Sequence, residues 1–266
     1  MNGQLGRISV VGLGPGETAL LAPMALAALE RAQAIVGYKA YIELVDPKLL
    51  ATRQVVSTGM MGEVERCDKA IELALSGVET AMVTSGDPGV YAMAGLVLEL
   101  VEARGLAESL EVEVVPGIPA VCAAAALLGA PLMHDFAVIS LSDLLTPWEL
   151  IARRVAAAAE ADFVIAVYNP RSGRRTTHLP RALALVAGHR GPETPVGLVK
   201  SAFRPAQEVT VTTMAELDVE AVDMQSILII GNSSTRFLPS PTGRRMLTPR
   251  GYAGKYCLGE RTKAGS

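Results

Sequence analysis

Short apolar runs alternate with helical patterns along the first half of the chain. The runs that predict β-strands are Arg7–Gly12, Thr80–Thr84, Glu111–Val115 and Phe136–Leu141. The spacing of apolar positions predicts helices near Ala22–Ala34, near Ala92–Ala103 and in the Ala-rich stretch after the third run. Strands that alternate with helices typically form a mainly parallel sheet. The pattern therefore predicts an α/β domain over residues 1–142.

The second half predicts another α/β domain, over residues 143–266. Its strand-like runs are Asp162–Val167, Pro195–Lys200, Glu208–Thr213 and Ser226–Gly231, with a helical pattern near Thr177–Gly188. Glu208–Thr213 alternates polar and apolar residues, which is typical of an antiparallel strand with one wet face. Ser140–Arg154 is interpreted as a linker in which Thr146 caps a helix that begins with Pro147.

Composition excludes several classes of protein. Half of the 266 residues are hydrophobic and the formal net charge is −3, which argues against a disordered chain and against a duplex nucleic-acid binder. The uncharged stretch Val114–Met133 is long enough to cross a bilayer, but its prolines and glycines predict a loop and a buried helix, so no membrane partner is expected. Cys67, Cys122 and Cys257 form neither a disulfide framework nor a metal-binding pair. A cytoplasmic protein without a bound metal is therefore expected.

Glycine-rich loops follow several of the predicted strands. Val11–Glu17 fails the dinucleotide fingerprint, because Glu17 stands where the third glycine belongs and Pro15 lacks a backbone N–H. Three other loops follow strands, at Thr84–Tyr91, Val115–Ala120 and Val167–Ser172. Each could be an ordinary turn. Together, at the carboxyl ends of strands, they predict a ligand cleft whose small residues suit a neutral adenosine rather than a phosphate.

These motifs together resemble the tetrapyrrole methylases. The resemblance is carried by GxGPG after the first strand, SGDP in Thr84–Tyr91, VPGI from Val115 and YNP from Tyr168. It implies a homodimeric enzyme with two α/β domains, with S-adenosylmethionine bound in an active-site cleft between them. The loop VPGIPA departs from the family, whose members usually carry Thr or Ser at the position of Pro119. A side-chain contact to the cofactor would be missing there.

Longer segments resemble the branch of the family that methylates precorrin-3B. They are Val36–Tyr41, Ser57–Cys67, His134–Glu149, Tyr168–Arg175 and Leu247–Tyr256. The implied reaction is methylation at C-17 coupled to contraction of the macrocycle, which gives precorrin-4 in cobalamin biosynthesis. The cofactor contacts that the resemblance implies are Pro15, Ser85, Gly86, Asp87, Val90, Tyr91, Pro119, Ala120, Asn169 and Gly197. The GxGPG loop, with Gly14, would border the substrate rather than hold a phosphate.

A precorrin carries many carboxylates, so its binding site should present cations. The candidates are Lys39, Arg171, Arg174, Arg175 and Arg250. Arg250 belongs to a basic tail formed by Arg236, Arg244, Arg245, Arg250, Lys255, Arg261 and Lys263, against the single acid Glu260. Solvated surface charge is the competing interpretation for every one of these residues.

Ring contraction also requires a base that removes a hydroxyl proton. Its identity stays open among Asp87, Glu17, Glu63, His134 and Asp135. For the adjacent pair His134 and Asp135 a structural role is favoured, because neighbouring side chains in a strand point apart.

Three other functions remain in competition. A methylase of the same fold could act on a cobalt-containing precorrin or on another ring carbon. A two-domain binding protein would bind its ligand without turnover. An NAD-dependent oxidoreductase is disfavoured by the broken fingerprint.

Overall fold

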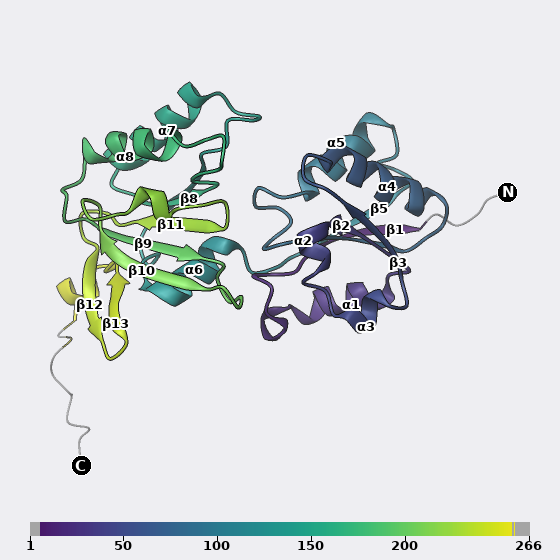
Figure 1. Ribbon diagram of the computed structural model, residues 1–266, viewed down its shortest axis with the longest axis horizontal. Helices are drawn as coiled ribbons and strands as arrows, with labels where there is room; N and C mark the ends of the chain where they lie inside the picture. Colours follow the sequence, from purple (N-terminus) through teal and green to yellow (C-terminus); the bar gives the residue numbers. More distant parts are fainter. Residues whose placement is uncertain (1–5, 257, 259–266) are drawn as a thin grey trace, which may run out of the picture. The chain divides into compact units, whose positions relative to one another are not determined.

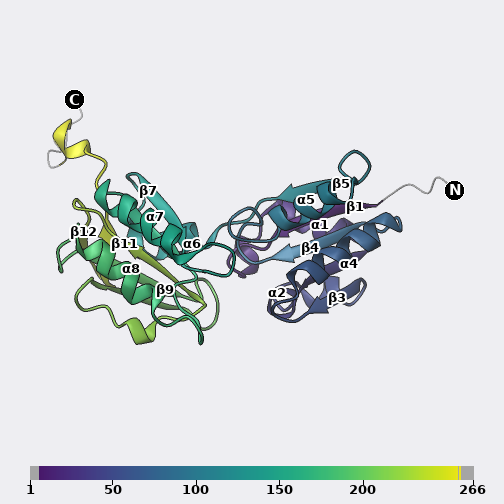
Figure 2. The same ribbon diagram turned by 90° about the horizontal axis from the view of Figure 1, so that it is seen from above.

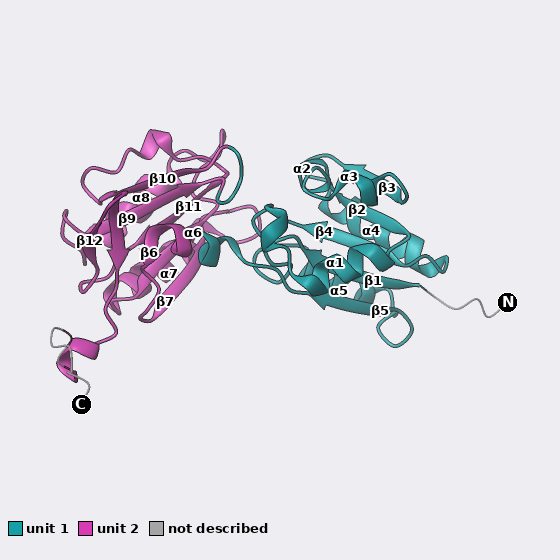
Figure 3. Cartoon of the chain, turned by 90° about the horizontal axis from the view of Figure 1, so that it is seen from below, with its two compact units in different colours: residues 1–123, 202–205 teal, residues 124–201, 206–266 magenta. Residues whose placement is uncertain are grey.

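The structure is a computed structural model that describes residues 6–256 and 258. It divides into two compact units, drawn in different colours in Figure 3. Unit 1 contains residues 1–123 and the short segment 202–205. Unit 2 contains residues 124–201 and 206–266.

Unit 1 is built on a parallel five-stranded sheet with the strand order β3-β2-β4-β1-β5. The strands are β1 (Arg7–Gly12), β2 (Ala34–Tyr38), β3 (Gln54–Thr58), β4 (Thr80–Thr84) and β5 (Glu111–Val115). The helices are α1 (Pro23–Arg31), α2 (Lys39–Ile42), α3 (Pro47–Leu50), α4 (Glu63–Leu75) and α5 (Ala94–Ala103). A 3₁₀ turn, η1, covers Thr18–Leu20. The three strands predicted for this unit's core are confirmed.

Apolar side chains of the central strands alternate between two faces of this sheet, as the period of a strand requires. Val36 and Met82 pack in one cluster with residues of α4 and α5. Ile35 and Val83 pack in the other, with residues of α1. Figure 1 shows α4 and α5 on one side of the sheet and α1 on the other. With both faces covered, ligands have access to unit 1 mainly at the ends of its strands.

Unit 2 has a mixed five-stranded sheet with the order β10-β9-β11-β8-β7. Its strands are β7 (Phe136–Ser140), β8 (Val164–Tyr168), β9 (Pro195–Lys200), β10 (Glu208–Thr213) and β11 (Ser226–Ile230). β7 and β8 are parallel and the other pairs are antiparallel, which confirms the antiparallel strand predicted at Glu208–Thr213. Helices α7 (Trp148–Glu160) and α8 (His178–Ala187) pack on one face (Figure 2).

The other face of this sheet is covered by the end of α6 (Ala120–Leu128) and by a small sheet. That sheet has the order β12-β13-β6 and consists of β12 (Arg236–Ser240), β13 (Gly243–Leu247) and β6 (Gly129–Ala130). Two further 3₁₀ turns, η2 and η3, cover Val219–Ala221 and Tyr252–Gly254. Part of the predicted basic tail is therefore a hairpin, in which Arg236, Arg244 and Arg245 lie exposed on β12 and β13.

Two details of the predicted organisation need correction. Phe136–Leu141 was predicted to close the first half of the chain, but its strand β7 pairs with β8 in the second sheet, so the break between units comes before residue 142. Thr146 does not cap a helix, because α7 begins at Trp148 and the capping position is Pro147, whose backbone is still extended at ψ 144°. The stretch Val114–Met133 forms the end of β5, a loop, α6 and β6. Within the described residues, no helix has the length and apolarity needed to cross a membrane.

The buried thiol of Cys67 gives a first testable prediction. Burial raises the pKa of Cys67 to about 12, so almost none of the reactive thiolate is present near pH 8. Iodoacetamide should therefore modify exposed Cys122 in the native protein and Cys67 only after unfolding. Peptide mass spectrometry measures both sites in one sample. Labelling of Cys67 at the rate of Cys122 in folded protein would contradict the prediction.

Candidate functional site

The loops at the carboxyl ends of β1 and β4 are joined by backbone hydrogen bonds. The Leu13 N–H donates to the Thr84 carbonyl at 2.9 Å. Gly14 and Gly86 then exchange two bonds, of 3.1 and 2.7 Å. Both glycines have positive φ, at 64° and 70°, which costs a glycine little and other residues more. The GxGPG and SGDP motifs thus form one connected structure in unit 1.

A third loop, after β5, approaches the first two so closely that only glycines fit. A Cβ on Gly117 would lie 2.2 Å from the Gly86 carbonyl oxygen and 2.8 Å from that of Gly12. A Cβ on Gly12 would lie 2.7 Å from both the Gly86 oxygen and the Gly117 nitrogen. Gly12, Gly86 and Gly117 are called the glycine contact below. It explains physically why glycines recur in these motifs, and it requires no phosphate.

Asp87 fixes the same loops through its carboxylate. Oδ1 accepts a hydrogen bond from the Gly89 N–H at 2.8 Å, and Oδ2 accepts one from the Gly117 N–H at 3.1 Å. Both oxygens therefore hold backbone in this structure, one within the SGDP loop and one across to the loop after β5. The role of Asp87 at this site includes shaping the loops.

Replacing Asp87 by alanine should weaken the binding of S-adenosylmethionine by about tenfold, because two backbone N–H groups lose a charged acceptor. Isothermal titration calorimetry measures the dissociation constant. Glu108→Ala removes an exposed acid of the same unit and serves as the matched control. Equal affinities of the two variants would show that the loops keep their shape without the carboxylate.

Arg204 was not among the residues predicted from the sequence. It lies in the segment 202–205 that groups with unit 1, although the chain places this segment between β9 and β10. Its Nε donates to the Pro15 carbonyl at 2.5 Å and Nη2 donates to the Ser85 hydroxyl at 2.7 Å. Burial lowers the pKa of Arg204, and the nearby Tyr41 opposes that shift. No sequence motif marks this residue, since its position depends on the return of a distant segment.

The remaining predicted cofactor residues of unit 1 surround these loops. Pro15 is buried, Val90 is partly buried and Tyr91 is exposed with a positive φ of 51°. Pro119 supplies the carbonyl that accepts from the first turn of α6, and Ala120 begins that helix. The Thr84 hydroxyl, at the end of β4, is fully buried and has no hydrogen-bond partner among the described residues.

Unit 2 has its own polar cluster at the carboxyl ends of β7 and β8. Asn169, with a positive φ of 49°, donates from its side chain to the Ser140 hydroxyl at 2.9 Å. Arg175 is buried and donates to the Asn169 carbonyl at 3.0 Å. Burial lowers the pKa of Arg175, while Asp143, 3.9 Å away, opposes the shift. Asp143 also pairs with His178 at 3.0 Å, a contact that the sequence did not indicate.

Other predicted residues of unit 2 are engaged with protein groups. Arg171 donates to the Val219 carbonyl at 3.0 Å and pairs with Glu220 at 2.5 Å. Gly197 makes room for packing, because a Cβ there would lie 2.4 Å from Leu128 Cδ1 and 2.8 Å from the sulfur of Met246. These contacts account for Arg171 and Gly197 structurally, and their predicted ligand contacts remain predictions.

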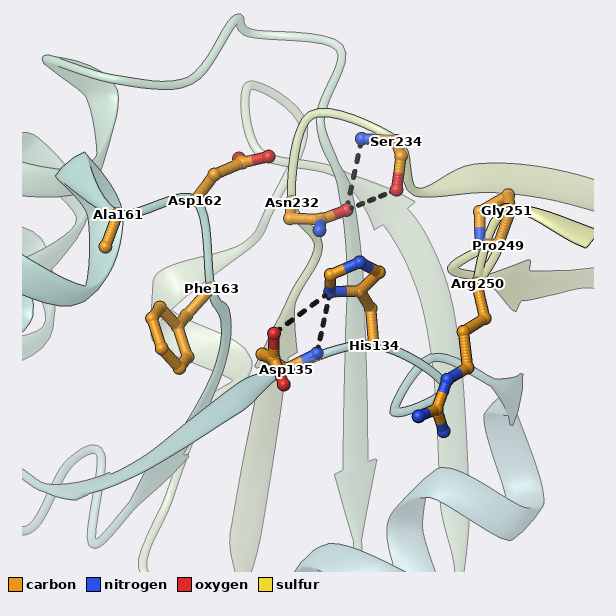
Figure 4. A pocket seen from close by; sticks show the side chains of 10 residues that line it. All are labelled: His134, Asp135, Ala161, Asp162, Phe163, Asn232, Ser234, Pro249, Arg250 and Gly251. Atoms are coloured by element: carbon orange, nitrogen blue, oxygen red, sulfur yellow. Dashed lines mark hydrogen bonds and ion pairs between the residues drawn. The ribbon is translucent and has the colours of Figure 1, made fainter. Parts of the chain in front are cut away.

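A hollow of about 320 Å³ in unit 2 contains three residues that the sequence singled out: His134, Asp135 and Arg250 (Figure 4). It opens beside residues 134–135 and 161–163, which come just before β7 and β8, and beside residues 232–234, just after the antiparallel β11. Asn169 comes after β8, at the opposite edge of this sheet. The structure therefore separates His134, Asp135 and Arg250 from the polar cluster at Asn169.

The other candidates lie on the surface. Lys39 is exposed at the start of α2, and Glu17 and Glu63 are exposed in unit 1, whereas Gly14 is buried in the loop contact. Arg174 is exposed in unit 2. Across residues 6–256, no group of three or more His, Cys, Asp or Glu side chains could hold a metal ion.

Comparison with known protein families identifies the family of this chain. Residues 7–218 match the Tetrapyrrole (Corrin/Porphyrin) Methylases. The chain belongs to the tetrapyrrole methylase family. It is 52% identical over 245 residues to a probable cobalt-factor III C(17)-methyltransferase of Salmonella typhimurium, covering 92% of this chain and 99% of that protein. It is 40% identical to the precorrin-3B C(17)-methyltransferase of a Sinorhizobium species, covering 94% of this chain and 98% of that one.

Solved structures of family members share the fold. The methyltransferase CobJ superposes with a TM-score of 0.86 at 37% identity, covering 92% of this chain and all of that one. A uroporphyrin-III C-methyltransferase of Thermus thermophilus, complexed with S-adenosylhomocysteine, has a TM-score of 0.63 at 25% identity, covering 85% of this chain and 97% of that one. The predicted α/β fold and membership of the family are confirmed.

Proposed function

We propose that this chain transfers a methyl group from S-adenosylmethionine to C-17 of a precorrin-3-type macrocycle in cobalamin biosynthesis. In this reaction methyl transfer is coupled to ring contraction, and precorrin-3B is converted to precorrin-4. The observation that carries the proposal is the 52% identity to a probable C-17 methyltransferase across almost the full length of both chains.

The unit 1 loops suit a largely neutral ligand of the adenosine type. The glycine contact brings backbone groups of three loops together in a space that one extra carbon atom would fill. The fully buried Thr84 hydroxyl, at the end of β4, has no partner within the described part of the chain, which is uncommon for a buried polar group. Bound S-adenosylmethionine supplies an already activated methyl group on a sulfonium. Such a donor needs positioning and exclusion of water more than it needs acid–base help.

The protein's own contribution follows from these contacts. Asp87 and Arg204 hold the loops in one geometry. Asp87 accepts a hydrogen bond from the Gly117 N–H, and Arg204 donates hydrogen bonds to the Pro15 carbonyl and the Ser85 hydroxyl. Fixed backbone groups position a ligand without requiring a strong ion pair at the sulfonium, which would stabilise the ground state most. Asn169 and Gly197 are proposed as further cofactor contacts from unit 2, and Gly14 as a substrate contact in unit 1.

A cobalt-containing substrate is the second candidate, and a specific observation favours it. The Salmonella relative at 52% identity and a Priestia megaterium relative at 46% are named as cobalt-factor III enzymes, whereas the Sinorhizobium precorrin-3B enzyme is 40% identical. This chain spans 47% of the Priestia protein and 99% of the Salmonella protein. The two substrates differ in the bound metal and share the carbon at which methylation is proposed.

One experiment tests the proposal directly. The purified protein is incubated with S-adenosylmethionine and either precorrin-3B or cobalt-factor III, under exclusion of oxygen for the cobalt compound. A mass gain of one methyl group, with formation of S-adenosylhomocysteine, is expected for one of them. Binding of both ligands without any turnover would favour a non-catalytic binding protein instead.

The proposal includes a homodimer that works in the cytoplasm. The family resemblance supports the dimer, and the free thiols of Cys67 and Cys122 suit a reducing compartment. Cys257 lies outside the described residues. Sedimentation equilibrium measures the oligomeric state, and a monomer at micromolar concentration would refute that part of the proposal.

A further inference from the structure

Three neighbouring strands of unit 1 end in hydroxyl side chains on one face of the sheet. Tyr38 of β2 pairs with Thr58 of β3, and Gly37 pairs with Val83, which brings Tyr38 beside Thr84 of β4. Strand alternation places these residues on the face that packs against α4 and α5, because Val36 and Met82 lie in that cluster. A polar row therefore crosses the carboxyl edge of the sheet, where ligands of α/β proteins bind.

Arg66, in the first turn of α4, lies over this row and is only 3% exposed. Its Nε donates to the Thr58 hydroxyl at 3.3 Å, and its guanidinium carbon lies 5.9 Å from the centroid of the Tyr38 ring. Its Nη1 is buried and has no hydrogen-bond partner among the described residues. Among the described residues, Arg66 forms no ion pair with a carboxylate. A buried guanidinium with an unpaired N–H destabilises the folded protein unless an anion accepts a hydrogen bond from it.

A second guanidinium lies close to the same group of residues. Tyr41 stacks edge-on against Tyr38 with 5.2 Å between ring centroids. Burial raises the pKa of Tyr41, while the charges of Arg204 and Arg66 both act to lower it. Arg204 is partly buried, and its two hydrogen bonds go to a carbonyl and a hydroxyl rather than to a carboxylate. Glu63 acts in the opposite direction on Tyr41, but it is exposed and its influence is weaker than that of either arginine.

We propose that Arg66 and Arg204 form a binding site for carboxylates on the rim of the tetrapyrrole substrate. A guanidinium forms charged hydrogen bonds to a carboxylate, and the Thr58 and Tyr38 side chains orient Arg66. The carboxylates of the substrate neutralise the two guanidinium charges, which pair with no carboxylate among the described residues. This inference rests on the proposed function for the class of ligand, and it assigns the task to residues other than Arg171, Arg175 and Arg250.

The test uses uroporphyrin III, a stable tetrapyrrole polycarboxylate, as the binding probe for the 266-residue chain. Arg66→Met should raise its dissociation constant about ten- to hundredfold, measured by fluorescence titration, because a charged hydrogen bond is lost. Lys69→Met removes the same charge from an exposed position on the same helix, and it should have little effect. Arg66→Lys keeps the charge without the planar fork, so an intermediate loss is expected even if the methionine variant folds poorly.

Two further measurements separate ligand binding from a structural role. The affinity of wild-type protein for uroporphyrin III should fall as salt is added, and this dependence should be weaker in Arg66→Met. The affinity of Arg66→Met for S-adenosylmethionine should be unchanged. Arg204→Met should weaken the binding of both uroporphyrin III and the cofactor, because Arg204 also donates hydrogen bonds to Pro15 and Ser85. Loss of cofactor affinity in Arg66→Met would assign the arginine to the carboxylate of the cofactor and overturn the inference.

The outcomes distinguish this inference from the proposed function. If wild type and Arg66→Met bind uroporphyrin III equally, or if wild type does not bind it, the inference is wrong even where methyl transfer to C-17 is observed. If Arg66 controls tetrapyrrole binding but no C-17 methylation occurs, the carboxylate site stands and the proposed reaction fails.

Discussion

Replacement of Gly117 by alanine is expected to raise the dissociation constant for S-adenosylmethionine about tenfold or more. The new Cβ would lie 2.2 Å from the carbonyl oxygen of Gly86 and 2.8 Å from that of Gly12. Both obstacles are backbone atoms, one at the end of β1 and one in the loop after β4, so no side-chain rotation relieves the overlap. The loops must separate, and overpacking of this kind costs about 1–3 kcal/mol of stability. A tenfold change in affinity corresponds to about 1.4 kcal/mol.

The separation of the loops would also disturb the Gly117 N–H, which donates to Asp87 at 3.1 Å. Calorimetric titration with S-adenosylmethionine measures the loss, and thermal unfolding measures the stability. Gly95→Ala is the matched control, because Gly95 lies in α5, where an added Cβ would meet no neighbouring atom within 4 Å. Alanine suits a helix better than glycine does. Unchanged cofactor affinity in Gly117→Ala would show that the glycine contact plays no part in binding.

Strands could be predicted from the sequence where burial leaves a continuous apolar run or where polar and apolar residues alternate. β1, β4 and β5 have the predicted bounds, as do β9 and β10. β3 was missed because its sequence QVVST is neither a continuous apolar run nor a strict alternation, and its Gln54, Val55 and Ser57 are exposed. The hairpin of β12 and β13 was missed because its arginines indicate a solvated tail.

The candidate site also has residues that the sequence locates and residues that it does not. Loops that follow strands can be located from local motifs, since the ends of parallel strands meet at one edge of a sheet. Arg204 cannot be found like this, because it reaches Pro15 and Ser85 from a segment more than a hundred residues away from either. Arg66 could have been noticed, as it falls within the segment Ser57–Cys67 that carried the resemblance. Its burial and its unused N–H are properties of the packing alone.

Replacement of Arg190 by methionine is expected to destabilise unit 2 by about 1–3 kcal/mol. The Arg190 side chain is 4% exposed and pairs with Asp162 at 3.0 Å. Its guanidinium also donates to the carbonyls of Ala159 at 2.9 Å, Phe163 at 3.2 Å and Gly231 at 3.4 Å. Methionine fills much of the volume but leaves these acceptors without their donor. Chemical denaturation measures the free energy of unfolding, and Arg154→Met, an exposed site on α7, is the control.

The stability of the same variant should also depend less on pH in the acid range. Burial alone would raise the pKa of Asp162, but the hydrogen bonds from Ser233 and the charge of Arg190 outweigh it and hold the pKa below its ordinary value. A carboxyl with a lowered folded-state pKa stabilises the fold above its unfolded pKa, and this contribution disappears as the pH falls through the folded value. Removal of Arg190 brings the two pKa values closer, so the stability of the variant should fall less steeply below about pH 4 than that of wild type. Parallel curves across that range would show that the pair with Asp162 contributes nothing, and that the buried arginine acts through its bonds to backbone carbonyls alone.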